Sequence, residues 1–216
     1  MPSPTDFNLS PYYDDFDEAK KFHRILFRPA FAVQARELTQ SQSILQNQVE
    51  KVSDHLFEKG AMVIPGEIGY DLNYFAVKLT SFSGTLSNYD GSVLTGGTSG
   101  VQAIVVNTAA TDGSDPDTLF VKYTKTGTNN TSVVFTDGET ITGVGADSSA
   151  VSAVVDTTAT GSAAEIQAGT YYINGFQVQV DNQTLILDKY TNTPSYRVGL
   201  TVTESFVTPS DDSTLN

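Results

Sequence analysis

Two spacings of apolar residues divide the chain, one typical of a helix and the other typical of β-strands. The helical spacing covers residues 33–60, where apolar side chains recur in alternating steps of four and three residues. A repeat of about 3.5 residues places these side chains on one narrow stripe, as in a coiled coil. Gly60 suits the end of such a helix, because glycine readily adopts the left-handed conformation found there. The predicted seam comprises Phe31, Ala35, Leu38, Gln42, Leu45, Val49, Val52 and Leu56.

Two packing partners fit this stripe. An ordinary amphipathic helix would turn it toward the chain's own sheet. Alternatively, the stripe would face copies of itself, because the heptad positions that flank it are uncharged and provide no ion pairs to select a different partner. Gln42 interrupts the apolar seam, and a single polar residue there can fix register and oligomer number. The pattern alone leaves both partners open.

Period-two alternation predicts strands in the second half of the chain, notably over residues 176–180 and 197–204. Asn174-Gly175, directly before residues 176–180, is a strong signal for a two-residue hairpin turn that leads into that strand. Residues 61–82 have the same alternating character. We therefore expect residues 61–82 and 169–216 to form one β-sheet domain.

Residues 83–168 differ in composition, since small and hydroxyl-bearing residues dominate and Lys122 and Lys125 are the only basic ones. Short β-like runs alternate with Asp-Gly and Gly-Gly turn signals, a spacing typical of a small all-β module. Residues 98–106 and 148–155 weakly echo each other, which favours two equivalent strands over a repeat array. We predict an inserted small β-barrel or sandwich. The expected fold class is mainly β with one long N-terminal helix, an α+β fold.

Residues 1–32 form an arm that is unusually rich in aromatic side chains, with an acidic run over 14–18 followed by Lys20, Lys21 and Arg24. Amphipathic spacing between Phe16 and Phe27 predicts a short helix after an extended start. We expect such an arm to lie across another surface, either of this subunit or of a neighbour. The predicted docking residues are Phe7, Tyr12, Tyr13, Phe16, Phe22 and Phe27.

Charge and composition narrow the classes of partner. The formal net charge is −13, which disfavours nucleic acid because such affinity depends on Lys and Arg at phosphates. No run approaches eighteen apolar residues, so no membrane span is predicted. The acidic, proline-containing start does not resemble a signal peptide. The absence of cysteine excludes disulfides, thiolate metal ligands and a cysteine nucleophile.

Candidate catalytic and metal-binding residues are sparse. His23 and His55 are the only histidines, and both fit packed or surface positions better than a catalytic role. The sequence contains no nucleophile elbow, P-loop or dinucleotide fingerprint. The aspartates of residues 112–117 could hold calcium, but their spacing is not that of an EF-hand loop, and a solvated turn is favoured. We therefore predict no enzymatic activity, no bound metal and no cofactor.

Two segments carry a resemblance to a known family. They are residues 7–66, with the run FRPAFAVQARELTQ, and residues 171–216, which begin YYINGFQVQV. Both resemble tail-associated virion proteins of tailed bacteriophages, familiar from phages of cyanobacteria, that carry a DUF4815-type domain. The resemblance implies a structural protein of the virion, in the tail or baseplate, and a polypeptide that continues beyond residue 216. It implies no catalytic residues.

The pattern and the resemblance together favour one function and leave an alternative. The favoured function is a homotrimeric baseplate-attached tail fibre, or a fibre adaptor, with the seam helices on the symmetry axis and the arm bound to other tail or baseplate proteins. The choice of a trimer rests on analogy with phage fibres. The alternative is a receptor- or glycan-binding tail module for host attachment, in which the acidic β module contacts the host surface.

Overall fold

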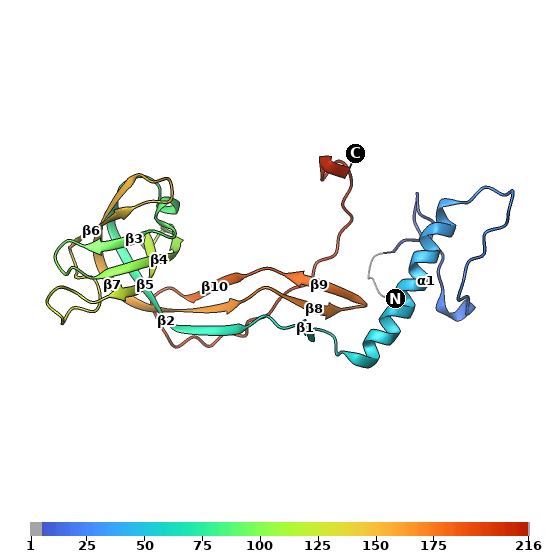
Figure 1. The fold of residues 1–216 in the computed structure, drawn as a ribbon, viewed down its shortest axis with the longest axis horizontal. Helices are drawn as coiled ribbons and strands as arrows, with labels where there is room; N and C mark the ends of the chain where they lie inside the picture. The colour runs from blue at the N-terminus through green and yellow to red at the C-terminus, as the bar shows by residue number, and fades with distance from the viewer. Residues whose placement is uncertain (1–5, 216) are drawn as a thin grey trace. The chain divides into compact units, whose positions relative to one another are not determined.

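The computed structural model describes residues 6–215 and divides the chain into two compact units. The first unit comprises the described parts of Met1–Glu67, Gln167–Asn182 and Gly199–Asn216, and the second comprises Ile68–Ile166 and Gln183–Val198. The first five residues of the predicted arm lie outside the described residues. The protein is mainly β with one α-helix in the described chain, as predicted (Figure 1).

The first unit contains the helix α1 (Ala35–Leu56) and a three-stranded antiparallel sheet in the order β1-β8-β9. The strands are β1 (Met62–Ile64), β8 (Gly169–Ile173) and β9 (Phe176–Val180), and two short 3-10 helices, η1 (Glu18–Lys20) and η3 (Ser213–Leu215), complete the unit. Asn174 and Gly175 connect β8 to β9 with φ values of 48° and 86°. Positive φ at both positions is the signature of a type I′ turn, which confirms the predicted hairpin.

The helix α1 is shorter than the predicted range of 33–60. It begins after Gln34, whose backbone N–H donates to the Glu37 carboxylate at 2.9 Å, and this bond satisfies one free donor of the first turn. It ends at Leu56 because Phe57 is already extended. Gly60, at φ 84°, then donates its N–H to the Tyr172 carbonyl at 2.8 Å, which directs the chain into the sheet.

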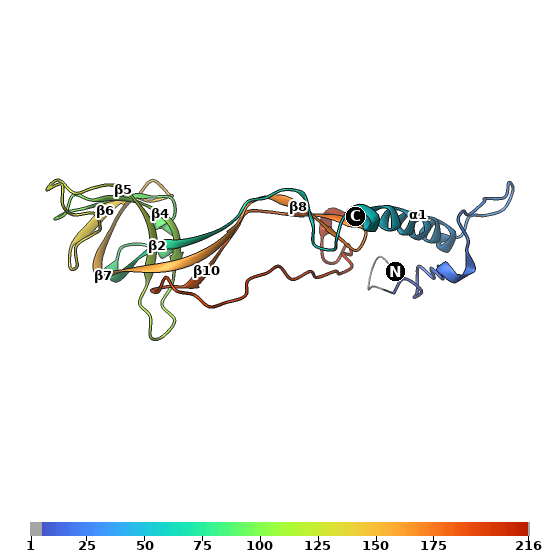
Figure 2. The ribbon, with the colours of Figure 1, turned by 90° about the horizontal axis from the view of Figure 1, so that it is seen from below.

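The second unit is a seven-stranded antiparallel sheet in the order β10-β7-β2-β5-β4-β3-β6. β6 also pairs with β7, so the six strands β7, β2, β5, β4, β3 and β6 form a closed ring of pairings. β2 and β7 are the longest strands and run side by side in both views (Figure 1 and Figure 2). The strands are β2 (Ile68–Phe82), β3 (Val93–Gly96), β4 (Gln102–Ala109), β5 (Thr118–Lys125), β6 (Thr140–Val144), β7 (Ala150–Ile166) and β10 (Gln183–Asp188), with the 3-10 helix η2 (Leu86–Tyr89) before β3.

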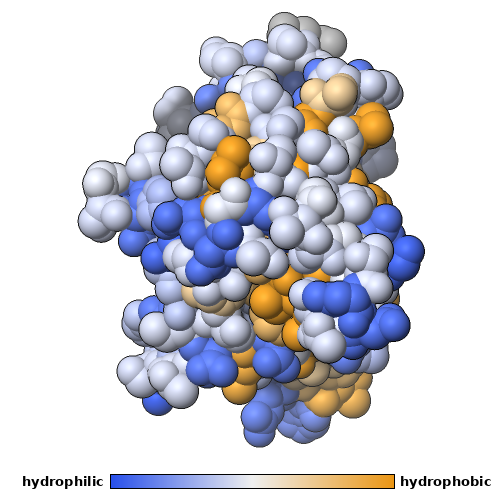
Figure 3. Space-filling model, turned by 90° about the vertical axis from the view of Figure 1, so that its left-hand side faces the viewer, coloured by the Kyte–Doolittle hydropathy of each residue, from blue (hydrophilic) through white to orange (hydrophobic). Residues whose placement is uncertain are grey.

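A continuous apolar core lies within this ring of pairings. Its fully buried side chains include Leu94, Leu119 and Ile141. The echoed segments 98–106 and 148–155 both contribute valine and alanine side chains to this core. Polar and neutral residues dominate the surface seen in Figure 3, and hydrophobic residues form separate groups on it.

The structure groups several segments differently from the predicted domains. Residues 61–64 do pair with β8, through Met62 and Tyr171, as expected for one sheet. However, β2 joins the second unit, because from Ile68 to Phe82 it pairs with β7, a strand of the predicted 83–168 insert. β10 also pairs with β7 and not with the first unit. Sequence alternation identified these strands, but it could not specify their partners.

Two predicted local elements are wrong. The expected helix between Phe16 and Phe27 is only the 3-10 turn η1, which stops because Lys21 adopts a left-handed conformation with φ 57°. The expected strand over residues 197–204 has no ladder partner in the described chain and is mostly exposed. Alternation is a pattern that a strand needs, but it does not form a strand without a neighbour. No helix within residues 6–215 is both long and apolar enough to cross a membrane.

Candidate functional site

The predicted seam is an exposed stripe along α1. Its large apolar residues within the helix expose between 53% and 70% of their surface, with Val49 the least exposed and Leu56 the most. Phe31, just before the helix, is 63% exposed, and Ala35 and Gln42 are exposed as well. The helical repeat places all these positions on one face. The structure therefore brings the predicted seam together on a surface that the chain itself leaves uncovered.

The opposite face of α1 is covered by the chain's own arm. The Ser43 hydroxyl donates to the Asp14 carboxylate, and the Gln40 amide donates to Asp15 at 3.0 Å. Farther along the helix, Lys51 forms an ion pair with Glu18, and this contact holds the pKa of the Glu18 carboxyl below its usual value. The arm thus docks on its own subunit over residues 14–18.

The side chains at the centre of this covered face are buried. Ile44 is 4% exposed and Asn47 is 5% exposed. Asp14 of the arm is also buried, at 6%. A helix that had no external partner would turn its most apolar stripe toward this interior, whereas α1 directs a largely polar face inward.

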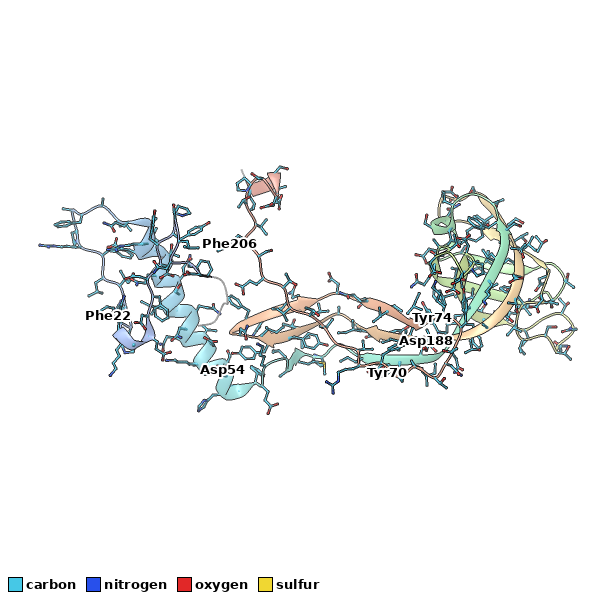
Figure 4. The ribbon with its side chains drawn as sticks, turned by 180° about the vertical axis from the view of Figure 1, so that it is seen from behind. Phe22, Asp54, Tyr70, Tyr74, Asp188 and Phe206 are labelled. Atoms are coloured by element: carbon cyan, nitrogen blue, oxygen red, sulfur yellow. The ribbon has the colours of Figure 1, made fainter. Side chains whose placement is uncertain are left out.

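The β8–β9 hairpin contacts a third side of α1. The Tyr172 hydroxyl donates to the Asp54 carboxylate, and the Gln46 amide donates to the Gly175 carbonyl at 2.8 Å (Figure 4 labels Asp54). Burial and the hydrogen bond to Asp54 raise the pKa of Tyr172 to about 12. A side chain at Gly175 would approach within 3.0 Å of Glu50, so the turn is closely fitted to the helix. These contacts orient α1 without using the stripe.

A pocket of about 640 Å³ opens between the arm and α1. The arm lines it with four aspartates, Asp6, Asp14, Asp15 and Asp17, and we call it the acidic pocket. Lys20 is the one basic residue that lines it, and its bond to Asp15 lowers the pKa of that carboxyl. Gln42 of the stripe also lines the pocket. The pocket therefore borders the exposed stripe.

The predicted docking residues separate into two groups. Phe7 and Tyr12 pack against Phe206, with ring centroids 5.4 and 5.9 Å apart, and Phe16 is half-buried. In contrast, Tyr13, Phe22 and Phe27 are 55%, 64% and 51% exposed. Figure 4 labels Phe22 in the loop between η1 and α1 and Phe206 in the C-terminal segment.

Sequence analysis did not identify two of these contacts. Phe206 was not assigned to the arm because nearly two hundred residues separate it from Phe7. Its only signal was a large aromatic residue in a polar segment. The Tyr172–Asp54 contact likewise joins segments that are distant in sequence, and neither residue belongs to a recognisable motif.

The structure shows where the histidines and the aspartates of residues 112–117 lie. His23 and His55 are both exposed. The Lys189 ammonium group binds Asp112 and Asp115, so a side-chain cation already occupies the loop considered for calcium. This contact lowers the pKa of Asp112 and raises that of Lys189. Residues 6–215 contain no group of three or more His, Asp or Glu placed to hold a metal ion.

Comparison with known proteins identifies a family for this arrangement. Residues 10–117, which contain most of the arm, α1 and the first strands of the second unit, match the family model described as Domain of unknown function (DUF4815). The chain belongs to the DUF4815 family. The DUF4815 match includes all the seam residues and ends just before β5. No curated protein and no solved structure matches the chain.

Proposed function

We propose that this chain is a non-enzymatic structural component of a phage tail, and that it self-associates through the exposed stripe of α1. The observation that carries the proposal is this stripe, because the arm and the hairpin contact other sides of the helix and leave the apolar stripe exposed. The virion location is supported by the resemblance of residues 7–66 and 171–216 to tail-associated phage proteins. A baseplate-attached tail fibre or fibre adaptor fits both the exposed stripe and this resemblance.

The exposed apolar area of the stripe favours association. Full burial of one Leu or Val side chain stabilises by about 1.5–3 kcal/mol, and each such residue of the stripe is more than half exposed. Burying the exposed parts of the five leucines and valines within α1 would contribute roughly 5–9 kcal/mol per subunit before the costs of association. Contiguous apolar surface of this kind marks an interaction site.

A trimer is the symmetry that we propose. Parallel copies of α1 would place Gln42 of each subunit at the same level of the seam, where its amide groups can bond to one another. The ring of strand pairings in the second unit supports its interpretation as a small β-barrel. In a fibre or adaptor this barrel would be a module attached to the symmetric helical part.

The phage-tail assignment is tested on purified virions of the phage that encodes this chain. Quantitative mass spectrometry of isolated tails should find the protein in a copy number that is a multiple of three. A virion without the protein, or its presence only in the capsid, would refute the assignment. This result does not depend on whether the isolated chain assembles.

A second function, host recognition, is favoured by one loop of the second unit. Residues 128–131 are exposed, yet the Asn129 side chain accepts the N–H groups of Thr131 and Ser132 at 3.0 and 2.9 Å. A rigid, exposed and amide-rich loop is a common site for polar ligands. Retention of the protein on a glycan array, and loss of retention in Asn129→Ala, would support recognition over a purely structural role.

A further inference from the structure

The loop between η1 and α1 is strongly basic in an otherwise acidic chain. The loop holds Lys21, Arg24 and Arg28, and residues 19–36, which add Lys20 of η1 and Arg36 of α1, contain no acidic residue. The rest of the chain holds the remaining 7 basic residues against 25 acidic ones. We call residues 21–34 the basic loop. Its charge makes it attractive to the acidic surface of another copy of this chain.

The basic loop is also apolar and exposed. Phe22, Leu26 and Phe27 expose 64%, 78% and 51% of their surface. The loop has no helix or strand, and the Arg28 guanidinium lies 4.6 Å from the centre of the Phe31 ring. Exposed aromatic and arginine side chains are enriched where proteins bind one another. A partner for this loop must combine negative charge with aromatic surface.

The acidic pocket has this combination. Its four aspartates outnumber Lys20, and Phe7, Phe16 and Phe176 supply aromatic surface between them. Asp6 and Asp17 accept hydrogen bonds from backbone N–H groups of their own segment and form no ion pair within the described chain. Their negative charges are therefore available to a cation that enters the pocket.

The pocket also lies within reach of a neighbouring loop. Its helical lining spans Thr39 to Gln46, which is about 6–17 Å along the axis from Ala35. Packed helices lie about 8–10 Å apart, and the middle of a 14-residue loop can extend about 23 Å from its ends. Gln42 lines the pocket and belongs to the seam, so a helix that packs on the seam brings its own basic loop to the pocket's edge.

We propose that the basic loop of one subunit binds in the acidic pocket of the adjacent subunit. The proposal rests on the self-association of α1 proposed above, and it adds a second contact that joins neighbouring subunits around the bundle. Arg24 and Arg28 would pair with the aspartates, while Phe22 and Leu26 would pack on the aromatic lining. A second copy is favoured over an anionic membrane because the pocket borders the seam.

Site-specific crosslinking tests the contact, since the chain has no cysteine of its own. Two differently tagged chains are co-expressed at full length, one with Leu26→Cys in the basic loop and the other with Asn8→Cys at the pocket, and are treated with a short bis-maleimide. An adduct that carries both tags joins two subunits by construction. We expect this adduct, and we expect Arg24→Glu with Arg28→Glu to reduce its yield about fivefold or more.

A matched control separates the local effect from net charge. Lys122→Glu with Lys125→Glu makes the same charge change in the second unit and should leave the yield unchanged. A second co-expression, in which both tagged chains carry Leu45→Cys, measures crosslinking between the seams themselves. Seam adducts without the loop–pocket adduct would overturn this proposal alone, whereas the absence of both adducts would overturn the self-association as well.

An anionic membrane as the alternative partner of the basic loop is tested separately. Wild-type protein is sedimented with vesicles that contain phosphatidylserine, and the pellet is compared with that of the Arg24→Glu, Arg28→Glu variant. Binding that depends on these arginines, together with no loop–pocket adduct in solution, would assign the loop to a membrane and overturn the proposal.

Discussion

Replacement of Glu139 by Gln should destabilise the second unit, because this carboxylate joins two loops. It accepts the backbone N–H groups of Thr136, Ser99 and Thr98 at 2.7, 2.9 and 3.0 Å, and the Ser99 hydroxyl at 2.8 Å. Glu139 is only 4% exposed. Gly96 leaves room for it, since a side chain there would lie 2.7 Å from the carboxylate oxygens.

The magnitude follows from the donors that glutamine cannot satisfy. One amide oxygen can replace one carboxylate oxygen, but the NH₂ group then faces two donors. An unsatisfied buried donor costs about 1–3 kcal/mol, and the loops can relax in part, so we expect a loss of ~2–4 kcal/mol in the free energy of unfolding. For a chain of this length that corresponds to a lower Tm by roughly 5–15 °C.

The effect should also depend on pH. Burial raises the pKa of Glu139, but the hydrogen bonds from Ser99, Thr136 and Thr98 outweigh it and lower the pKa below the usual 4.5. A lowered pKa in the folded state means that the stabilisation is present above the unfolded pKa and is lost as pH falls through the folded value. The difference between wild type and Glu139→Gln should therefore shrink as the pH falls below the usual value of 4.5.

Urea unfolding followed by near-UV circular dichroism of the tyrosines measures this difference. Asp137→Asn is the matched control, because it makes the same change of carboxylate to amide at an exposed neighbour and should stay within about 0.5 kcal/mol of wild type. A Glu139→Gln variant as stable as this control at pH 7 would refute the reasoning.

Three further substitutions test other contacts. Gln42→Ile should raise the thermal stability of the assembly or change its oligomer number in sedimentation velocity, and no change in either would place Gln42 off the axis. Tyr172→Phe removes the bond to Asp54 and should speed amide hydrogen exchange at Gly60, so unchanged exchange would contradict the role of this contact. Lys189→Met should raise the pKa of Asp112 toward its usual value in an NMR titration. The stability change should stay below about 1 kcal/mol because the Asp112 side chain is exposed to solvent. An unchanged pKa would contradict the assignment of Lys189 as the main cause of the shift.

Local signals were sufficient to predict α1 and the β8–β9 hairpin. The four-and-three spacing identified the helix, and Asn174-Gly175 specified a turn that needs positive φ at both positions. The heptad pattern grouped the seam residues on one helix face but left its packing partner open, and the structure shows that the chain itself leaves this face exposed. The helix and the hairpin depend on neighbouring residues only.

The remaining contacts depend on partners that are distant in sequence. Nothing in the acidic run at residues 14–18 indicates that it lies on Ser43 and Gln40 of the same subunit. The domain boundary was missed because residues 61–64 and β2 have the same alternating character, although β1 pairs with β8 and β2 pairs with β7. The aromatic arm was treated as one docking surface, whereas Phe206 covers one part and leaves Phe22 exposed.

The most direct test of the account is the mass of the protein in solution. Sedimentation equilibrium of the wild-type chain should give three times the subunit mass of 23.2 kDa, and Leu45→Asp should reduce it to one subunit. Val144→Asp, at a similarly exposed position in the second unit, should leave the trimer intact. A wild-type monomer at all concentrations, or a Leu45→Asp variant that remains trimeric, would contradict self-association through the α1 stripe.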